Sequence, residues 1–266
     1  MNMVGELLIN KTRLASLDVK KEGYTEIIGQ LDRVTMDLHH TVMQIRMVPI
    51  GGMFNRFPRM VRDISKEMNK EVNLEITGED TELDRSIIDE LSDPLTHLIR
   101  NAVDHGIEKS SIREEKGKDR EGTINLRAYQ KGSEIIIEVE DDGSGIDINA
   151  LTNKAIDEGV LTKEDLEDMD RKEKLDLIFH PGFSTTEEVS DVSGRGVGMD
   201  VVKKTVEKEL EGQVFIETEE EKGTKFTISL PLTLAITEAL MVKIGRETFA
   251  LPLNNVNETL KIEIDD

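Results

Sequence analysis

The chain has 266 residues, and its 55 acidic and 34 basic side chains give a formal net charge of −21 at pH 7. This charge disfavours nucleic acid and anionic membrane surfaces as partners, because both repel a strongly acidic protein. The absence of cysteine excludes a disulfide framework and thiolate chemistry. No apolar run approaches the roughly 18 residues of a membrane span, and the N-terminus lacks a signal-peptide profile. We therefore expect a cytoplasmic protein without membrane insertion.

Residues 1–48 show the periodicity of two amphipathic helices, over 3–17 and about 25–47. In the second helix, residues at alternating steps of three and four form a seam typical of a bundle or coiled coil: Leu31, Val34, Leu38, Thr41, Ile45 and Val48. Two such helices bury too little surface to stand alone. We therefore expect two copies of the hairpin to pair as a four-helix bundle, which Pro49 and the Gly51–Gly52 pair would end.

Residues 49–231 alternate between helical and strand patterns, which predicts an α/β sandwich. The expected helices cover 53–69, 84–105, 149–157, 171–179 and 197–210. The expected strands cover 71–77, 122–130, 134–141, 213–219 and 224–231. The polar connection at 147–193 is long for a compact domain, so we expect it to be a lid over a ligand. The predicted fold class is thus α+β, a helical hairpin followed by this sandwich.

Four polar side chains share one face of the helix expected at 84–105: His97, Asn101, Asp104 and His105. The opposite side is apolar and can hold the helix against a core. An amide and a neutral imidazole can both contribute to magnesium coordination, while a carboxylate and an imidazole can orient phosphate and water. Polar rows are also common on solvated helix faces, so this row gains its meaning only with the motifs downstream.

The strand expected at 134–141 alternates apolar and acidic residues before the sequence Asp141-Asp142-Gly143-Ser144-Gly145. It delivers the Asp141 carboxylate to the end of a sheet. Gly143 and Gly145 would let a flat ligand approach the backbone closely. A carboxylate fixed there can accept a hydrogen bond from an exocyclic amine, which favours adenine over guanine. A plain turn is the alternative interpretation of this motif taken alone.

A second glycine cluster, Gly194-Arg195-Gly196-Val197-Gly198-Met199-Asp200, opens the helix expected at 197–210. Its free amide groups at a helix start favour phosphate. Further on, Gly223-Thr224 sits between two expected strands and adds another turn of close approach. Together with the polar helix, these clusters predict a pocket for a magnesium nucleotide.

The order of these motifs resembles the ATP-binding superfamily (GHKL, or Bergerat, fold) of histidine kinases, gyrase, HSP90 and MutL. Further segments resemble the chemotaxis (CheA-type) histidine kinases within it: Gln-Ile-Arg-Met-Val-Pro at 44–49, Phe-Asn-Arg-Phe-Pro-Arg-Met-Val-Arg-Asp at 54–63, Gly-Glu-Asp-Thr-Glu-Leu-Asp at 78–84 and Pro-Gly-Phe-Ser-Thr at 181–185. The resemblance runs nearly from end to end. It implies an ATP-dependent protein-histidine kinase that uses ATP and magnesium.

The resemblance also implies residue roles. Asn101 matches the magnesium-ligand asparagine, His105 a histidine that helps to hold metal and phosphates, and His97 the residue nearest the γ-phosphate. Asp141 matches the adenine-reading aspartate, with Gly143 and Gly145 beside the base and Thr224 near it. The ATP-binding set is completed by six residues: Asp104, Gly194, Arg195, Gly196, Gly198 and Met199. Lys154 is a further expected phosphate contact. Ser144 departs from the family, which often has arginine there.

By the same resemblance, the chain divides into a dimerisation hairpin at 1–48, a kinase catalytic domain at 49–231 and an incomplete SH3-like regulatory domain at 232–266. The histidine that receives the phosphoryl group is expected in a separate phosphotransfer domain that this sequence lacks. The implied partners are a second copy of the chain, that domain, a chemoreceptor with its coupling adaptor and, indirectly, response regulators.

Three alternatives remain open. In the gyrase and MutL branch a glutamate four residues before the asparagine activates water, but this chain has His97 there, which favours transfer over hydrolysis. A dimer scaffold with a vestigial pocket would be expected to have lost Asn101, Asp141 or a glycine cluster. An ordinary sensor kinase would phosphorylate His39 or His40, yet the acidic residue and proline that follow such a histidine are missing.

Overall fold

The structure is a computed structural model, and it describes residues 29–31, 33–35, 38, 41, 45–181, 198–232, 239–245, 247–252 and 256. The chain divides into two compact units, Met1–Thr233 and Leu234–Asp266. In the second unit, β8 (Ala239–Ile244) and β9 (Glu247–Pro252) pair as an antiparallel hairpin. Among the described residues, no helix is long and apolar enough to cross a membrane.

The first unit is built on a mixed five-stranded sheet with the order β2-β4-β5-β7-β6. Its strands are β2 (Val72–Thr77), β4 (Gly122–Lys131), β5 (Glu134–Asp141), β6 (Gln213–Glu219) and β7 (Gly223–Pro231). β2 and β4 are parallel, which requires a crossover between them, and the other pairs are antiparallel. This is the α+β sandwich that the sequence predicts for this region.

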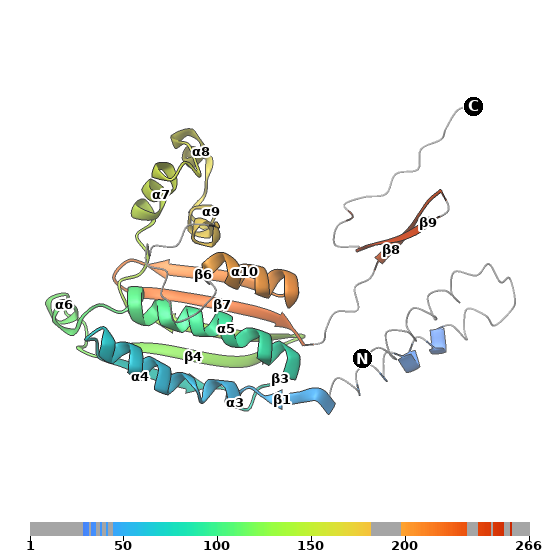
Figure 1. Cartoon of the computed structure of the whole chain (residues 1–266), viewed down its shortest axis with the longest axis horizontal. Coiled ribbons are helices and arrows are strands. Elements are labelled where there is room, and N and C mark those ends of the chain that lie inside the picture. Colours follow the sequence, from blue (N-terminus) through green and yellow to red (C-terminus); the bar gives the residue numbers. More distant parts are fainter. Residues whose placement is uncertain are drawn as a thin grey trace, which may run out of the picture. The chain divides into compact units, whose positions relative to one another are not determined.

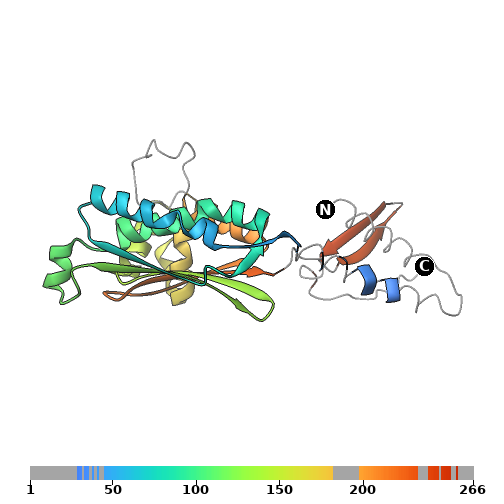
Figure 2. The ribbon, with the colours of Figure 1, turned by 90° about the horizontal axis from the view of Figure 1, so that it is seen from below.

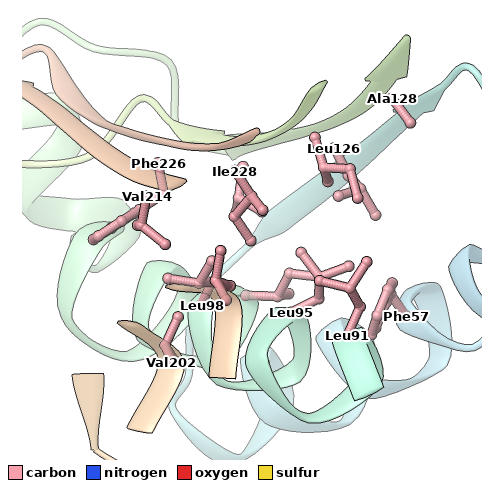
Figure 3. Packing of buried hydrophobic residues seen from close by; sticks show 14 of the residues in the cluster. Phe57, Leu91, Leu95, Leu98, Leu126, Ala128, Val202, Val214, Phe226 and Ile228 are labelled. Carbon is pink, nitrogen blue, oxygen red and sulfur yellow. The ribbon is translucent and has the colours of Figure 1, made fainter. Parts of the chain in front are cut away.

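Three helices cover one face of the sheet: α4 (Phe57–Glu67), α5 (Arg85–Asn101) and α10 (Met199–Lys204) (Figures 1 and 2). Figure 3 shows helix side chains such as Leu91, Leu95 and Leu98 facing Leu126 and Ile228 of the strands. All five are at most 1% exposed. Burial alternates along β4 from residue 122 to residue 128, so one face of that part of the strand joins this core.

Helix α5 begins where β3 (Glu82–Asp84) ends, and Asp84 caps it by accepting a 2.8 Å hydrogen bond from the Ser86 amide. The sequence predicts regular helix through residue 105, and this is corrected by the structure. The last turn is a π-helix, η1 (Ala102–Gly106), in which the Ile107 amide donates to the Ala102 carbonyl. The Lys70 ammonium donates to the carbonyls of Val103 and Asp104, at 2.9 and 2.5 Å, and so satisfies C-terminal carbonyls of this turn.

Three other boundaries differ from the prediction. The second N-terminal helix, expected to reach residue 47, ends at Arg46, and β1 (Met47–Pro49) pairs with β3, so Val48 lies in a strand rather than on the helical seam. The Gly51–Gly52 pair starts α3 (Gly51–Phe54) instead of breaking a helix. The helix expected at 53–69 is divided at Asn55–Arg56, where Pro58 favours a new helix start.

The remaining helices lie around the ends of the sheet. α6 (Ser110–Glu115), between η1 and β4, was not expected. The connection after β5 contains α7 (Ile148–Asp157), α8 (Lys163–Asp168), α9 (Arg171–Asp176) and the 3-10 turn η2 (Leu177–Phe179). Leu151, Ala155 and Leu177 give this connection a small core of its own. α10 continues as the π-helix η3 (Thr205–Glu209), so the helix predicted at 197–210 is not uniformly α-helical.

Candidate nucleotide-binding site

Asp141 is the last residue of β5, where it lies opposite Ile124 of β4 and Thr224 of β7. The residue is only 6% exposed, and its Oδ1 accepts a 2.9 Å hydrogen bond from the Gly143 amide. Burial raises the pKa of this carboxyl to about 6, and the neighbouring Asp142 adds to the rise, while hydrogen bonds from the Gly143 and Thr224 amides and the charge of Lys118 oppose it. The strand therefore delivers a buried carboxylate to the sheet end, where the sequence places it.

Glycines allow neighbouring backbone segments to pack closely around the Asp141 turn. A Cβ on Gly143 would lie 2.0 Å from the carbonyl oxygen of Gly106, and a Cβ on Gly223 would lie 1.9 Å from that of Asp141. Gly145 has a φ of +71°, which few other residues adopt, and a Cβ there would lie 2.3 Å from the carbonyl oxygen of Glu219. These positions require glycine on steric grounds alone.

A hydroxyl pair joins the neighbouring turns. The Thr218 Oγ1 lies 3.1 Å from the Thr224 Oγ1 and donates to the Gly223 carbonyl at 3.0 Å. The same oxygen accepts a 2.9 Å hydrogen bond from the Ile146 amide. Thr224 was predicted from the sequence, whereas Thr218 was not, since an isolated threonine in a strand carries no local signal. The pair links the turn after Asp141 to the β6–β7 hairpin.

The four polar residues predicted on one helix face lie in two helical segments. His97 and Asn101 lie in α5, while Asp104 and His105 lie in η1. The Nδ2 of Asn101 contacts the sulfur of Met199 at 3.3 Å, which joins the end of α5 to the start of α10. The Nε2 of His105 lies 3.5 Å from the Asp104 carboxylate, and both side chains are partly exposed. The wider π turn changes the spacing on which the sequence argument depended, yet it keeps these groups at one end of the helix.

His97 has a lowered pKa, chiefly because burial disfavours the imidazolium, and the positive charge of Arg100 adds to the effect. Asp200, in the first turn of α10, acts in the opposite direction, and His105 contributes a smaller lowering. The imidazole is therefore neutral at pH 7 and lies in electrostatic reach of both α10 and His105. A neutral imidazole can accept a proton or orient a reacting group.

Of the other predicted site residues, some have a position in a described helix and some lie outside the described residues. Gly198 caps the N-terminus of α10, and Met199 is buried at its first position. Lys154 lies in α7, where its Nζ is 3.6 Å from Glu158. Gly194, Arg195 and Gly196 fall outside the described residues, as do His39 and His40.

These residues fit an adenine nucleotide and a magnesium ion. The buried Asp141 supplies an acceptor at the end of the sheet, and Asn101 supplies an amide oxygen suited to Mg²⁺. Among the described residues no group of three His, Cys, Asp or Glu side chains could hold a metal by itself.

The comparisons with known proteins agree with this geometry. Residues 90–234 match the family described as histidine kinase-, DNA gyrase B- and HSP90-like ATPases. The match covers more than half of the chain and contains every predicted site residue from His97 to Thr224. The chain belongs to this ATPase family.

Within the family, the chain is similar to chemotaxis proteins over most of its length. It is 45% identical to chemotaxis protein CheA of Bacillus subtilis over 100% of the chain and 40% of that protein. CheA of Halobacterium salinarum is 49% identical over 89% of the chain and 35% of the relative. CheA of Borreliella burgdorferi is 52% identical over 90% of the chain and 27% of the relative. The resemblance to CheA-type histidine kinases is thereby confirmed, and the chain spans less than half the length of these relatives.

Proposed function

We propose that this chain is the dimerisation and ATP-binding core of a chemotaxis histidine kinase. It binds Mg-ATP and transfers the γ-phosphoryl group to a histidine of a separate phosphotransfer domain. The observation that carries the proposal is the buried Asp141 carboxylate at the end of β5, held in a glycine turn that packs against Gly106 at the end of the helix that carries Asn101 and His105. The names of the relatives, all chemotaxis proteins, support the choice within the ATPase family.

The adenine end of the site rests on Asp141. Its Oδ1 is already bonded to the Gly143 amide, so the carboxylate is oriented before ligand arrives. When ionised it accepts a hydrogen bond from the exocyclic amine of adenine, whereas guanine presents an acceptor in the same place. Gly145 lies beneath the base in this proposal, and Thr224 adds a hydroxyl from β7.

The phosphate end of the proposed site is formed by the end of α5 with η1 and by the start of α10. Asn101 and His105 would hold magnesium and the phosphates, and Asp104 would orient water or phosphate beside His105. Magnesium supplies charge neutralisation on the phosphates when bound. The glycines at 194, 196 and 198, together with Arg195 and Met199, would approach the phosphates from the other side, and Lys154 would reach them from the lid.

Transfer rather than hydrolysis follows from His97. Its lowered pKa weakens the imidazole as a base for water, and position 97 lacks the glutamate that gyrase-like enzymes use in that step. It can instead orient the incoming phosphoacceptor, since positioning and electrostatics supply most of phosphoryl-transfer catalysis. A gyrase-like ATPase is the second candidate.

A homodimer through residues 1–48 is part of the proposal. The described residues of the second helix, at 29–31, 33–35, 38, 41, 45 and 46, are helical. Along the seam predicted from the sequence, the side chains of Val34, Leu38 and Ile45 are 64%, 45% and 79% exposed in the single chain. Large apolar side chains in one row favour a partner helix, and a second copy of the hairpin supplies one.

The remaining partners rest on resemblance. Residues 232–266 would begin the regulatory domain that binds the coupling adaptor and, through it, a chemoreceptor; the β8–β9 hairpin supports a small β module there. Response regulators would be reached indirectly, through the phosphotransfer domain. A cytoplasmic location is consistent with all of these partners.

The test is incubation with radiolabelled ATP, alone and with the family's phosphotransfer domain added in trans. The chain is expected to label that domain, to leave itself unlabelled and to release phosphate slowly. Self-labelling that is lost on His39→Gln or His40→Gln would instead support an ordinary sensor kinase. Fast phosphate release without transfer would support the gyrase-like ATPase.

A further inference from the structure

The segment between η1 and β4, residues 107–121, contains a cluster of charged side chains that lies behind the Asp141 turn. It includes α6, and its cations Arg113 and Lys118 meet Glu108 and Asp142. Arg113 is 1% exposed, which is rare for an arginine. A buried cation of this kind is retained only with several partners, so its contacts define what the cluster holds in place.

Arg113 binds both the backbone and the side chain of Asp142. Its Nη1 donates to the Asp142 carbonyl at 3.2 Å and to the Glu108 carboxylate at 3.3 Å. Its Nη2 donates to the Asp142 carboxylate at 2.9 Å, and its Nε donates to the Asp119 carbonyl at 2.7 Å. The second oxygen of Asp142 accepts a 2.9 Å hydrogen bond from the Thr123 amide. The residue next to Asp141 is thus fixed at its carbonyl and at both carboxylate oxygens.

Lys118 binds the turn one residue further on. Its Nζ donates to the Gly143 carbonyl at 2.6 Å, to the Asp142 carbonyl at 3.1 Å and to the Glu108 carboxylate at 3.2 Å. The side chain is only 16% exposed. Both carbonyls belong to the turn whose Gly143 amide orients Asp141, so the ammonium holds the opposite side of that turn.

The charge of Lys118 also acts on Asp141 itself. The charged side chains that influence this carboxyl are Asp142, which raises its pKa, and Lys118, which lowers it. The residues that β4, β7 and η1 place against it are uncharged: Ile124, Thr224 and Gly106. Without Lys118, Asp141 would lose the positive charge that lowers its pKa, while the charge of Asp142 that raises it would remain.

We propose that Lys118 is a positioning residue for adenine recognition: it fixes the carbonyls of Asp142 and Gly143 and so holds the turn that orients Asp141. The charge of the same ammonium also favours the ionised form of Asp141. This inference rests on the proposed role of Asp141 in binding ATP. Arg113 supports the same turn from behind. Lys118 acts through Asp141 and Gly143, which distinguishes it from the groups proposed to meet the nucleotide.

The chain offers a matched control for Lys118. Lys116 binds the same Glu108 carboxylate, at 3.4 Å, and also Glu221, but no carbonyl of the Asp141 turn. Both lysines lie in the same segment, so removing either changes the net charge of that segment equally. Only the loss of Lys118 should affect adenine binding.

The experiment compares Lys118→Met, Lys118→Arg and Lys116→Met with wild type, in calorimetric titrations with Mg-ATP from about pH 5 to about pH 9. Lys118→Met is expected to weaken ATP about tenfold at pH 7, with part of the loss recovered at higher pH, where Asp141 is ionised again. Lys118→Arg, which keeps the charge, should stay within about threefold of wild type. Lys116→Met should bind like wild type.

A second measurement follows the ionisation of the Asp141 carboxyl directly. An NMR titration of the Asp141 side chain should show ionisation at higher pH in Lys118→Met than in wild type. Unchanged ATP affinity in Lys118→Met, or an equal loss at every pH with no change in the Asp141 titration, would overturn the inference. If wild type fails to bind ATP while the NMR shift is present, the proposed function is wrong, and with it adenine recognition, but the coupling of Lys118 to Asp141 holds.

Discussion

Gly106, at the end of η1, and Asp141, at the end of β5, touch across the site. A Cβ added to Gly106 would lie 3.0 Å from the carboxyl carbon and from both carboxyl oxygens of Asp141. The carbonyl of Gly106 also accepts a 2.9 Å hydrogen bond from the Ser144 amide. The helix that carries the proposed phosphate contacts and the strand that carries the proposed adenine contact therefore meet at a single glycine.

Gly106→Ala should weaken ATP binding and leave the stability of the fold nearly unchanged. Its methyl group would press on the Asp141 carboxyl and turn it, so ATP affinity should fall about tenfold. Stability should be little changed, because alanine in a helical turn gains up to about 1 kcal/mol relative to glycine and offsets the crowding. Calorimetry and thermal unfolding measure the two effects.

Gly52→Ala is the control for this variant. Nothing lies within 4 Å of a Cβ at Gly52, which is also in a short helix. It should unfold at an equal or higher temperature and bind ATP like wild type. Wild-type affinity in Gly106→Ala would show that Asp141 does not have to keep its observed orientation.

Asp141→Asn should weaken ATP by at least about a hundredfold, because the amide replaces an acceptor with a donor that faces the exocyclic amine. The fold should remain intact, since burial already disfavours the charge that is removed. Calorimetry with Mg-ATP tests the first statement and circular dichroism the second. An unchanged affinity would remove Asp141 from the site.

ATP binding should depend on pH through the same carboxyl. Its pKa is raised from 3.8 to about 6, so the acceptor is protonated below that value, and affinity should fall about tenfold for each further pH unit. The stability of the fold depends on pH in the opposite direction. The folded chain keeps the proton between pH 3.8 and about 6 while the unfolded chain has lost it, so this group's contribution to stability is lost as pH rises through that window.

The control for the pH profile is Asp141→Asn, whose weak residual binding should lose this step. Affinity for ATP is measured by calorimetry at each pH, and stability by denaturant unfolding without nucleotide. A wild-type binding profile that is flat between about pH 5 and about pH 7 would contradict the assignment of the step to Asp141.

The sequence predicts the sheet and the Asp141 end of the site well, because both depend on local pattern. Along β5 the apolar side chains and the glycines that follow define the strand, its end and the turn without reference to other segments. The same holds for α5, whose apolar spacing is local. The place of Asp141 at the end of its strand is therefore anticipated from the sequence, while its role in binding stays a prediction.

The features that were missed depend on contacts between distant segments. The π turn of η1 is stabilised by Lys70, more than thirty residues earlier in the chain. α6 looks like a solvated charge run until Arg113 is seen to be buried against Asp142. Gly51 starts a helix because its amide bonds to the Glu79 carbonyl. None of these pairs can be found from spacing alone.

Leu38→Glu should yield monomers that still bind ATP. Leu38 lies on the predicted seam and is 45% exposed in the single chain, so a carboxylate there costs little in the monomer but would be buried in a four-helix bundle. Light scattering at micromolar concentration measures the mass. Arg33→Glu, on the same helix but off the seam, should remain dimeric, and a monomeric wild-type protein would contradict the proposed bundle.

His97→Glu should shift the reaction from transfer towards hydrolysis. In this chain burial and the charge of Arg100 lower the pKa of the imidazole, which weakens it as a base towards water. The same burial and the charge of Asp200 would raise the pKa of a glutamate at this position and so strengthen it as a base. That glutamate would also take the position that the catalytic glutamate has in gyrase-like enzymes. Phosphate release should rise about tenfold, and labelling of the phosphotransfer domain should fall.

His97→Gln separates the base from the hydrogen-bonding role. Glutamine keeps a donor and an acceptor but cannot take a proton, so transfer should fall without any gain in phosphate release. Both variants should bind Mg-ATP like wild type, because neither changes Asp141 or Asn101. If His97→Glu and His97→Gln release phosphate at the same rate, residue 97 does not act on water. The preference for transfer would then have to come from the phosphoacceptor domain.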